Sequence, residues 1–276
     1  MAISAQDVKK LREMTQAGMM DCKRALEEAD GDFEKAIDIL RKKGQKVSEK
    51  RKDREAKEGL IVAKIADDNK SGILVEVNCE TDFVARNEVF SQFADDVAVL
   101  VLRAQPVDLE ALKALDFKDG RTTGEALTDL TGKIGENLGI RRFEILRSDQ
   151  GQVISYIHPG ARLGVLIDLK GNGQLDVAGR DVAMQVAALN PIATRREEVP
   201  QEVQQKELDI GREAARLQNK PEHLIDRIAT GKLERYFKDY VLLEQPFVKD
   251  ASRTVKQMLH QAEADVRTFV RFALGD

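Results

Sequence analysis

Apolar stripes near the amino terminus share spacings of three and four residues, which place their members on one face of a helix. Their members are Val8, Leu11 and Met14; then Cys22, Ala25, Leu26 and Ala29; and then Phe33, Ala36, Ile37 and Leu40. Ser4 and Asp7 have the spacing of a capping box, with Asp in place of the usual Glu. Gly18 separates the first two stripes, and we expect Gly44 to end the third helix. The pattern predicts a three-helix domain over residues 1–44.

Residues 45–58 follow with almost no apolar side chain. This composition indicates a mobile linker or a helix surrounded by solvent. Its local excess of Lys and Arg also fits a segment that touches RNA. Acidic residues lie among the basic ones, and no aromatic residue is present to stack on a nucleobase, which favours the solvated linker.

The apolar pattern becomes strand-like after residue 58. Residues 60–65 and 73–77 predict two strands joined by a polar turn. The turn contains Asp67-Asp68, a pair that could suggest a metal site but fits a hairpin turn better. A long apolar stripe over residues 90–104 then predicts a helix.

A further helix and strand complete this segment. Thr122 and Glu125 have capping-box spacing and predict a helix start, and we expect that helix to end at Gly139. Residues 140–146 predict a third strand. We therefore interpret residues 59–150 as one α+β subdomain.

The same pattern occurs a second time in residues 151–276. Ile73–Val77 matches Val165–Leu169 at an offset of 92, whereas Val97-Ala98 matches Val182-Ala183 at an offset of 85. The first copy thus holds seven more residues between strand and helix, within residues 78–96. We expect an α+β fold with two duplicated subdomains, each with a small antiparallel sheet.

The second copy contains an insertion at about residues 198–243. Val203, Ile210 and Leu217 recur every seven residues, and Pro221 marks a turn before a second helical stripe. This pattern predicts an antiparallel helical hairpin or short coiled coil with heavily charged outer faces.

Composition narrows the class of protein. The chain has 276 residues, 42% of them apolar, and its 44 basic and 48 acidic residues give a net charge of −4. So balanced a charge gives no general attraction to nucleic acid or membrane. The two cysteines, Cys22 and Cys79, form no C-x-x-C pair, and the amino terminus has no apolar signal core. We expect a cytoplasmic protein.

Motifs for covalent chemistry are absent from the sequence. We find no P-loop, no G-x-G-x-x-G after a strand and no G-x-S-x-G, and the three histidines have no ligand spacing. We expect a protein that is not an enzyme and has no cofactor and no metal site. An enzyme whose site is assembled from distant residues is a further alternative.

Residues 75–86 begin as a strand and end as the start of a helix, with Asp82 and Phe83 side by side in the turn. An exposed acid–aromatic pair of this kind can push between the elements of another protein. The alternative is that Phe83 belongs to the core and Asp82 caps the helix, which makes Arg86 a solvated residue of its first turn. The residues alone favour this second interpretation.

Other candidate contact residues are equally ambiguous. Met19 and Met20 lie at a helix junction, where both cannot face inward, and soft exposed Met side chains suit recognition of a partner helix. The alternative is that both pack within a small core. His158 begins a predicted hairpin turn and is a second-choice contact. Cys22 fits inert core, and Cys79 is ambiguous.

These motifs resemble those of the bacterial elongation factor Ts family, in the family's order along the whole chain. They are residues 11–23 (LREMTQAGMMDCK), 76–86 (EVNCETDFVAR), 158–166 (HPGARLGVL) and 245–248 (QPFV). Gln16 stands where a glycine is expected, and Pro159 enlarges the turn after His158. The three-helix segment resembles a ubiquitin-associated domain.

The resemblance implies a nucleotide-exchange factor for the GTPase elongation factor Tu, with an amino-terminal domain that docks on that partner. In the family, a Thr-Asp-Phe-Val element disturbs the partner's magnesium and phosphate site. The matching positions are Thr81, Asp82, Phe83 and Val84. Residues that match the docking surface are Arg12, Met19, Met20, Lys23 and His158.

The resemblance leaves open a homodimer within a heterotetramer, and we expect no direct contact with nucleic acid or membrane. The alternative function is a translation-associated adaptor whose amino-terminal domain binds a helix and whose basic linker touches RNA. The Thr-Asp-Phe turn distinguishes the two hypotheses, because an exchange factor needs a projecting wedge beside a strand and an adaptor does not.

Overall fold

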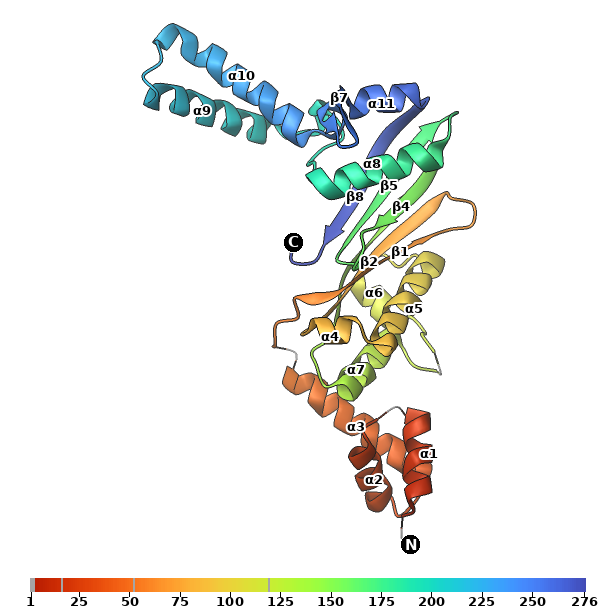
Figure 1. The fold of residues 1–276 in the computed structure, drawn as a ribbon. Coiled ribbons are helices and arrows are strands. Elements are labelled where there is room, and N and C mark those ends of the chain that lie inside the picture. Colours follow the sequence, from red (N-terminus) through yellow and green to blue (C-terminus); the bar gives the residue numbers. More distant parts are fainter. Residues whose placement is uncertain (1–2, 16, 52, 119) are drawn as a thin grey trace. The chain divides into compact units, whose positions relative to one another are not determined.

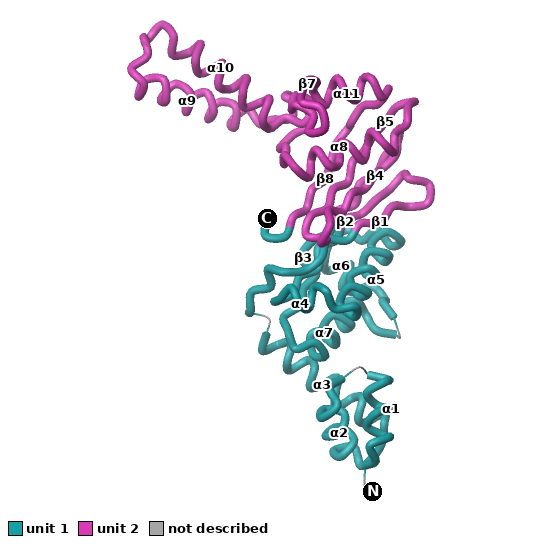
Figure 2. Tube along the Cα trace, viewed as in Figure 1, with its two compact units in different colours: residues 1–62, 75–143, 274–276 teal, residues 63–74, 144–273 magenta. Residues whose placement is uncertain are grey.

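The computed structural model describes residues 3–15, 17–51, 53–118 and 120–276. The chain divides into two compact units (Figure 2): residues 1–62, 75–143 and 274–276 form the first, and residues 63–74 and 144–273 form the second. The boundary falls inside the strands β1 (Glu58–Ile65), β2 (Ser71–Cys79) and β3 (Gly139–Arg147). This division differs from the subdomain ranges 59–150 and 151–276, which stay a prediction.

Helices α1 (Ala5–Thr15), α2 (Met19–Glu28) and α3 (Phe33–Arg51) form the amino-terminal part of the first unit (Figure 1). Their core holds most residues of the predicted stripes, namely Val8, Leu11, Cys22, Ala25, Leu26, Ala29 and Ala36. Met14 is an exception, because it is exposed. Ser4 Oγ accepts from Asp7 N at 3.1 Å, and Asp7 Oδ2 accepts from Ser4 N at 3.2 Å, which confirms the predicted capping box.

The prediction that Gly44 ends the third helix is wrong, because α3 continues to Arg51. Gly44 is buried and faces Gly132 of α7 (Thr123–Ile134). A Cβ built on Gly132 would lie 2.3 Å from Gly44 Cα. Glycine inside a helix costs about 1 kcal/mol relative to alanine, and here it lets two helix backbones approach. Residues 45–51, which the sequence left as linker or solvated helix, are therefore helical.

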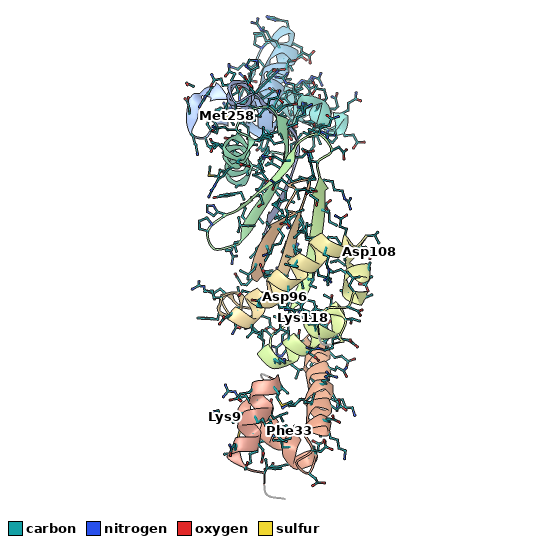
Figure 3. All side chains as sticks on the ribbon, turned by 90° about the vertical axis from the view of Figure 1, so that its right-hand side faces the viewer. Lys9, Phe33, Asp96, Asp108, Lys118 and Met258 are labelled. Atoms are coloured by element: carbon teal, nitrogen blue, oxygen red, sulfur yellow. The ribbon has the colours of Figure 1, made fainter. Side chains whose placement is uncertain are left out.

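The first sheet has the strand order β1-β2-β3. The middle strand, β2, is buried from Gly72 to Cys79, as expected for a strand with neighbours on both sides. Helices α4 (Asp82–Ala85), α5 (Glu88–Ala104), α6 (Leu109–Ala114) and α7 lie between β2 and β3 in the chain. Asp96 of α5 and Lys118, labelled in Figure 3, form an ion pair at 2.5 Å that ties the loop before α7 to α5.

Helix α7 begins as predicted and ends earlier than predicted. Thr122 and Glu125 form the expected capping box. The helix ends at Gly135, whose φ of +80° lies in the left-handed region that favours glycine, and not at Gly139, which begins β3. The predicted third strand is confirmed within β3.

The second sheet has the order β4-β5-β8, from β4 (Gln152–Ile157), β5 (Leu163–Gly171) and β8 (Ala264–Ala273). Helices α8 (Leu175–Leu189) and α11 (Val255–Gln261) pack against it, and Met258 of α11 is labelled in Figure 3. The core between them includes Val165, Ile167, Val182, Val186 and Leu259. The element order strand hairpin, helix, helix, strand thus occurs in both halves of the chain, which confirms the predicted α+β fold.

The insertion in the second half is a hairpin of α9 (Gln201–Leu217) and α10 (Glu222–Tyr240), antiparallel in Figure 1. The short elements η1 (Arg196–Glu198), η2 (Leu242–Glu244), β6 (Pro246–Phe247) and β7 (Asp250–Thr254) connect it to the sheet unit.

The hairpin prediction is confirmed. Of the three predicted seam residues, Val203 packs against a buried cluster that includes Phe237, but the prediction is wrong for the other two. Ile210 and Leu217 are exposed, and α9 buries Gly211 and Ala215 instead. A Cβ on Gly211 would lie 2.9 Å from Ala229 Cα of α10, so small residues set a close spacing between the helices. Leucine and isoleucine at the seam would hold them further apart.

Candidate partner-binding site

The turn between β2 and α5 contains two helix starts in succession. Thr81 is extended, with φ −127° and ψ 154°, and its Oγ1 accepts from Val84 N at 3.4 Å to cap α4. Asn87 then caps α5 by accepting from Val89 N at 2.9 Å. The prediction of a strand that ends in a helix start is confirmed, with a single extra turn, α4, between the two. We call residues 81–84 the tip.

Phe83 projects from the tip into solvent, with 81% of its surface exposed. The other nine phenylalanines, all among the described residues, are buried or half-buried. The core interpretation of Phe83 is therefore wrong. Ala85 is buried, so it anchors α4 from below while the aromatic ring faces outward. Burial of this exposed ring against a partner would be favourable, because it removes apolar surface from water.

Asp82 is half-exposed and forms an ion pair with Arg86 at 2.9 Å. The interpretation of Asp82 as the helix cap is wrong, because Thr81 supplies the cap. A surface pair between residues one turn apart contributes at most about 1 kcal/mol. Asp82 can therefore exchange Arg86 for a partner's group at low cost.

Glu136, in the connection between α7 and β3, holds the start of the tip. Its Oε2 accepts from the backbone N–H of Glu80 at 3.1 Å and of Thr81 at 3.0 Å. Its Oε1 accepts from Thr81 Oγ1 at 2.7 Å. Sequence reasoning missed this residue, and its separation of more than fifty positions from the tip gives no pattern that could reveal it.

Glu80 is tied to the same connection in the opposite direction. Its carboxylate accepts from Asn137 N at 2.6 Å and pairs with Arg54 at 3.4 Å and Arg51 at 3.6 Å. The Asn137 N–H and then the two guanidinium groups lower the pKa of Glu80 below its ordinary value. The segment at the end of α3 is thereby joined to the residue that precedes the tip.

Cys79, whose role the sequence left ambiguous, is buried and lies two residues before the tip. Its Sγ donates to Thr81 O at 3.1 Å. Burial, followed by the charge of Glu136, raises the pKa of the thiol to about 12. The thiol therefore stays protonated and acts as packing and as a weak hydrogen-bond donor.

The predicted docking residues of the amino-terminal helices are all on the surface. Arg12 on α1 and Lys23 on α2 are exposed, and Lys23 faces Glu27 at 3.8 Å. Met19 and Met20, in the first turn of α2, are 45% and 61% exposed, so the core interpretation of this pair is wrong. Gln16 lies outside the described residues.

His158 belongs to the second unit and lies in the turn between β4 and β5. Its ring is exposed, and Nδ1 is 2.8 Å from Tyr156 Oη. The enlarged turn closes with Gly160 at φ +90° and Ala161 at φ +54°. The predicted hairpin turn is confirmed, and the contact role stays a prediction.

Comparison with known proteins decides the family. A family model described as "Elongation factor TS" matches residues 80–276. Proteins named "Elongation factor Ts" are similar over the full chain: 47% identical in Amoebophilus asiaticus over 279 residues, 100% of each chain, and 43% identical in Chloroherpeton thalassium over 285 residues, 99% of each chain.

The chain belongs to the elongation factor Ts family. A third relative, from Chlorobium luteolum, is 45% identical over 285 residues, 99% of each chain. The elongation factor Ts match begins at Glu80, so it includes the tip and Glu136, whereas the relatives also cover the amino-terminal helices. The family name identifies the chain as an elongation factor of translation.

The described residues show neither a metal cluster nor a membrane-spanning helix. They contain no group of three or more His, Cys, Asp or Glu side chains that could hold a metal ion. Among the helices of the described chain, none is long and apolar enough to cross a membrane. The Asp67-Asp68 pair lies in the β1–β2 turn, where Asp68 Oδ1 accepts from Lys70 N at 2.8 Å.

Proposed function

We propose that the chain is a guanine-nucleotide exchange factor that binds elongation factor Tu in its GDP form and promotes release of GDP. The observation that carries the proposal is the tip: Phe83 is 81% exposed on a short helix, and the cap residue of that helix, Thr81, is held by the carboxylate of Glu136. The tip also favours an exchange factor over an RNA-touching adaptor, because an adaptor has no use for a projecting wedge.

The proposed mechanism uses no covalent chemistry. A bound nucleoside diphosphate is held by a cradle of backbone N–H groups and by a magnesium ion that bridges its oxygens. Phe83 would bury its ring between elements of the partner next to that cradle, and Asp82 would bring a negative charge close to the phosphates. Displacing one element of the cradle weakens both the phosphate contacts and the ion. The proposal thus makes the chain a binding protein and not an enzyme.

The binding of GDP and the binding of the chain to the GTPase are thermodynamically linked. If the chain lowers the partner's affinity for GDP by some factor, GDP lowers the affinity for the chain by the same factor. Couplings of this kind are typically about 1–3 kcal/mol, and a strong exchange factor needs more. The chain therefore binds the empty GTPase best and leaves when GTP enters.

Docking is assigned to residues outside the tip. Met19 and Met20 offer exposed, flexible apolar side chains, and Arg12 on α1 and Lys23 on α2 supply exposed positive charge. His158 is a further proposed contact. In this proposal the chain works in the cytoplasm with the translation machinery.

The test is release of labelled GDP from elongation factor Tu, measured with increasing amounts of the chain. Phe83→Ala is expected to lower the maximal rate by a factor on the order of 30, the effect of a central aromatic contact worth about 2 kcal/mol. Asp82→Ala is expected to cost about threefold, because the charge acts at a partly hydrated position.

Val107→Ala is the matched control, because Val107 is also an exposed apolar residue of the first unit, 90% exposed in the loop before α6. It should leave the rate unchanged. Release of GDP that is no faster with the wild-type chain than without it would refute the exchange function. Acceleration that survives Phe83→Ala would leave the function standing and remove the tip from it.

A further inference from the structure

The tip cannot hold its own direction. Helix α4 has four residues, a single turn, which is shorter than a helix that is stable on its own. Its cap bond from Val84 N to Thr81 Oγ1 is long, at 3.4 Å, and therefore weak. Something outside the helix must fix the direction in which Phe83 points.

The carboxylate of Glu136 meets this need. It accepts the Thr81 Oγ1 hydrogen at 2.7 Å, and this bond orients the same hydroxyl whose lone pair receives Val84 N–H. It also accepts the backbone N–H groups of Glu80 and Thr81. Bonds to an ionised acceptor are about twice as strong as neutral ones, and chains of bonds reinforce one another.

The position of Glu136 is itself well defined. It follows Gly135, which ends α7 in the left-handed conformation, so the chain turns sharply just before it. Its neighbour Asn137 donates its backbone N–H to Glu80 at 2.6 Å and its side-chain amide to Arg54 O at 2.6 Å. The two connections therefore hold each other through bonds in both directions.

We propose that Glu136 is a positioning residue for nucleotide exchange: it fixes Thr81 as the cap of α4 and so aims Phe83 at the partner GTPase. Glu136 itself touches no partner group in this proposal. The inference rests on the proposed exchange function and adds to it a residue outside the Thr-Asp-Phe-Val element.

The direct test is Glu136→Gln. The glutamine side chain keeps the size of the residue but replaces one acceptor oxygen by an NH₂ donor, which cannot accept from the Glu80 and Thr81 donors. The maximal rate of GDP release is expected to fall about tenfold, the effect of losing charge-assisted bonds. The concentration of chain that gives half the maximal rate should stay within about twofold, because the docking residues are untouched.

Glu110→Gln is the matched control, since Glu110 lies on α6 of the same unit, its side chain is 83% exposed, and it pairs with Lys113 one turn further along that helix. It should leave both the maximal rate and the half-saturation concentration at their wild-type values.

A double substitution separates positioning from a general structural role. If Glu136 acts through the tip, Glu136→Gln should have almost no further effect on the maximal rate in a Phe83→Ala background. A full tenfold loss in that background means that Glu136 acts elsewhere, and the proposal is overturned. A wild-type rate for Glu136→Gln alone overturns it as well.

Thr81→Val provides a second route if Glu136→Gln does not fold, as judged by its far-ultraviolet circular dichroism. Valine keeps the shape of threonine but removes the hydroxyl bond to Glu136, and a loss of about threefold in maximal rate is expected. No loss would overturn the proposal. Wild-type chain that fails to release GDP would instead overturn the exchange function itself, so the two failures are distinguishable.

Discussion

The connection after β2 and the connection after β5 leave equivalent strands of the two halves and are built in opposite ways. The first runs over residues 80–87 and carries α4, with Phe83 facing solvent. The second runs over residues 172–174 and goes directly into α8. The first connection is therefore five residues longer than the second, and α5 is two residues longer than α8, which together account for the seven extra residues predicted within residues 78–96. The tip lies within the longer connection.

The two connections also differ in what holds them. In the second half, Asn172 N donates to Glu263 O at 3.1 Å, just before β8. A Cβ on Gly171 would lie 2.2 Å from Glu263 O, and one on Gly173 would lie 2.0 Å from Ala262 O. In the first half, the corresponding support comes from the side chain of Glu136, just before β3.

The same order of elements therefore supports two different kinds of connection. In the second connection the backbone lies so close to the backbone before β8 that there is no room for a side chain at Gly171 or Gly173. In the first connection a side-chain carboxylate supplies the support, and the chain there forms a capped turn that presents an aromatic ring. The second half therefore has no counterpart of the tip among its described residues.

The largest expected effect compares Phe83, the exposed aromatic of the first connection, with Phe90, the buried aromatic of the helix that follows it. Phe90, in the first turns of α5, is fully buried, and Phe90→Ala should lower the free energy of unfolding by about 4 kcal/mol. Phe83→Ala should change it by no more than about 0.5 kcal/mol. Urea denaturation of both variants measures the difference. Similar losses in the two would mean that Phe83 is buried in the folded chain.

The second connection makes the next prediction. Gly173→Ala places a methyl group against the Ala262 carbonyl and should cost about 2 kcal/mol of stability. Gly139→Ala is the control, because a Cβ there meets nothing within 4 Å. Thermal unfolding compares the two variants, and equal melting temperatures would show that the second connection is looser than the structure indicates.

Acid should weaken the support of the tip. The pKa of Glu80 is lowered in the folded chain from an ordinary value of 4.5, by the Asn137 N–H and then by Arg54 and Arg51. Its contribution to stability is therefore present above pH 4.5 and is lost as the pH falls through the lower folded value. Glu80→Gln should cost about 1 kcal/mol at neutral pH, and the gap to wild type should shrink on acidification. A gap independent of pH would exclude this ionisation as the cause.

The smallest effect belongs to the surface pair of the tip. Arg86→Ala removes the ion pair with Asp82, whose partners are 80% and 47% exposed, and should change stability by less than about 0.5 kcal/mol. Denaturation in low and high salt checks this. A larger, salt-sensitive loss would show that the pair helps to hold α4.

Local pattern predicted those features that depend on neighbours in sequence. The stripes with Leu11 and Leu26 and the capping boxes at Ser4 and Thr122 are present because their spacing alone decides them. The family motifs located the tip, although the residues alone favoured a core position for Phe83. Its exposure depends on a fold that local periodicity does not contain.

Long-range packing explains the errors. The sequence pattern predicted a helix end at Gly44, but the structure places Gly132 against it. The pattern also placed Ile210 in the seam, but Ile210 is exposed and Gly211 contacts Ala229 instead. Glu136 could not be predicted, because its role arises only when two distant connections meet. Side-chain tethers of this kind leave no periodic trace in a sequence.

The two native thiols have a practical consequence. Cys22 and Cys79 are both fully buried, and the raised pKa of Cys79 keeps it from forming the thiolate that reacts with maleimides. A cysteine introduced at an exposed position such as Val107 would then take up a fluorophore selectively, with both native thiols left in place. Fluorescence energy transfer could follow association with a labelled GTPase on an otherwise unaltered chain.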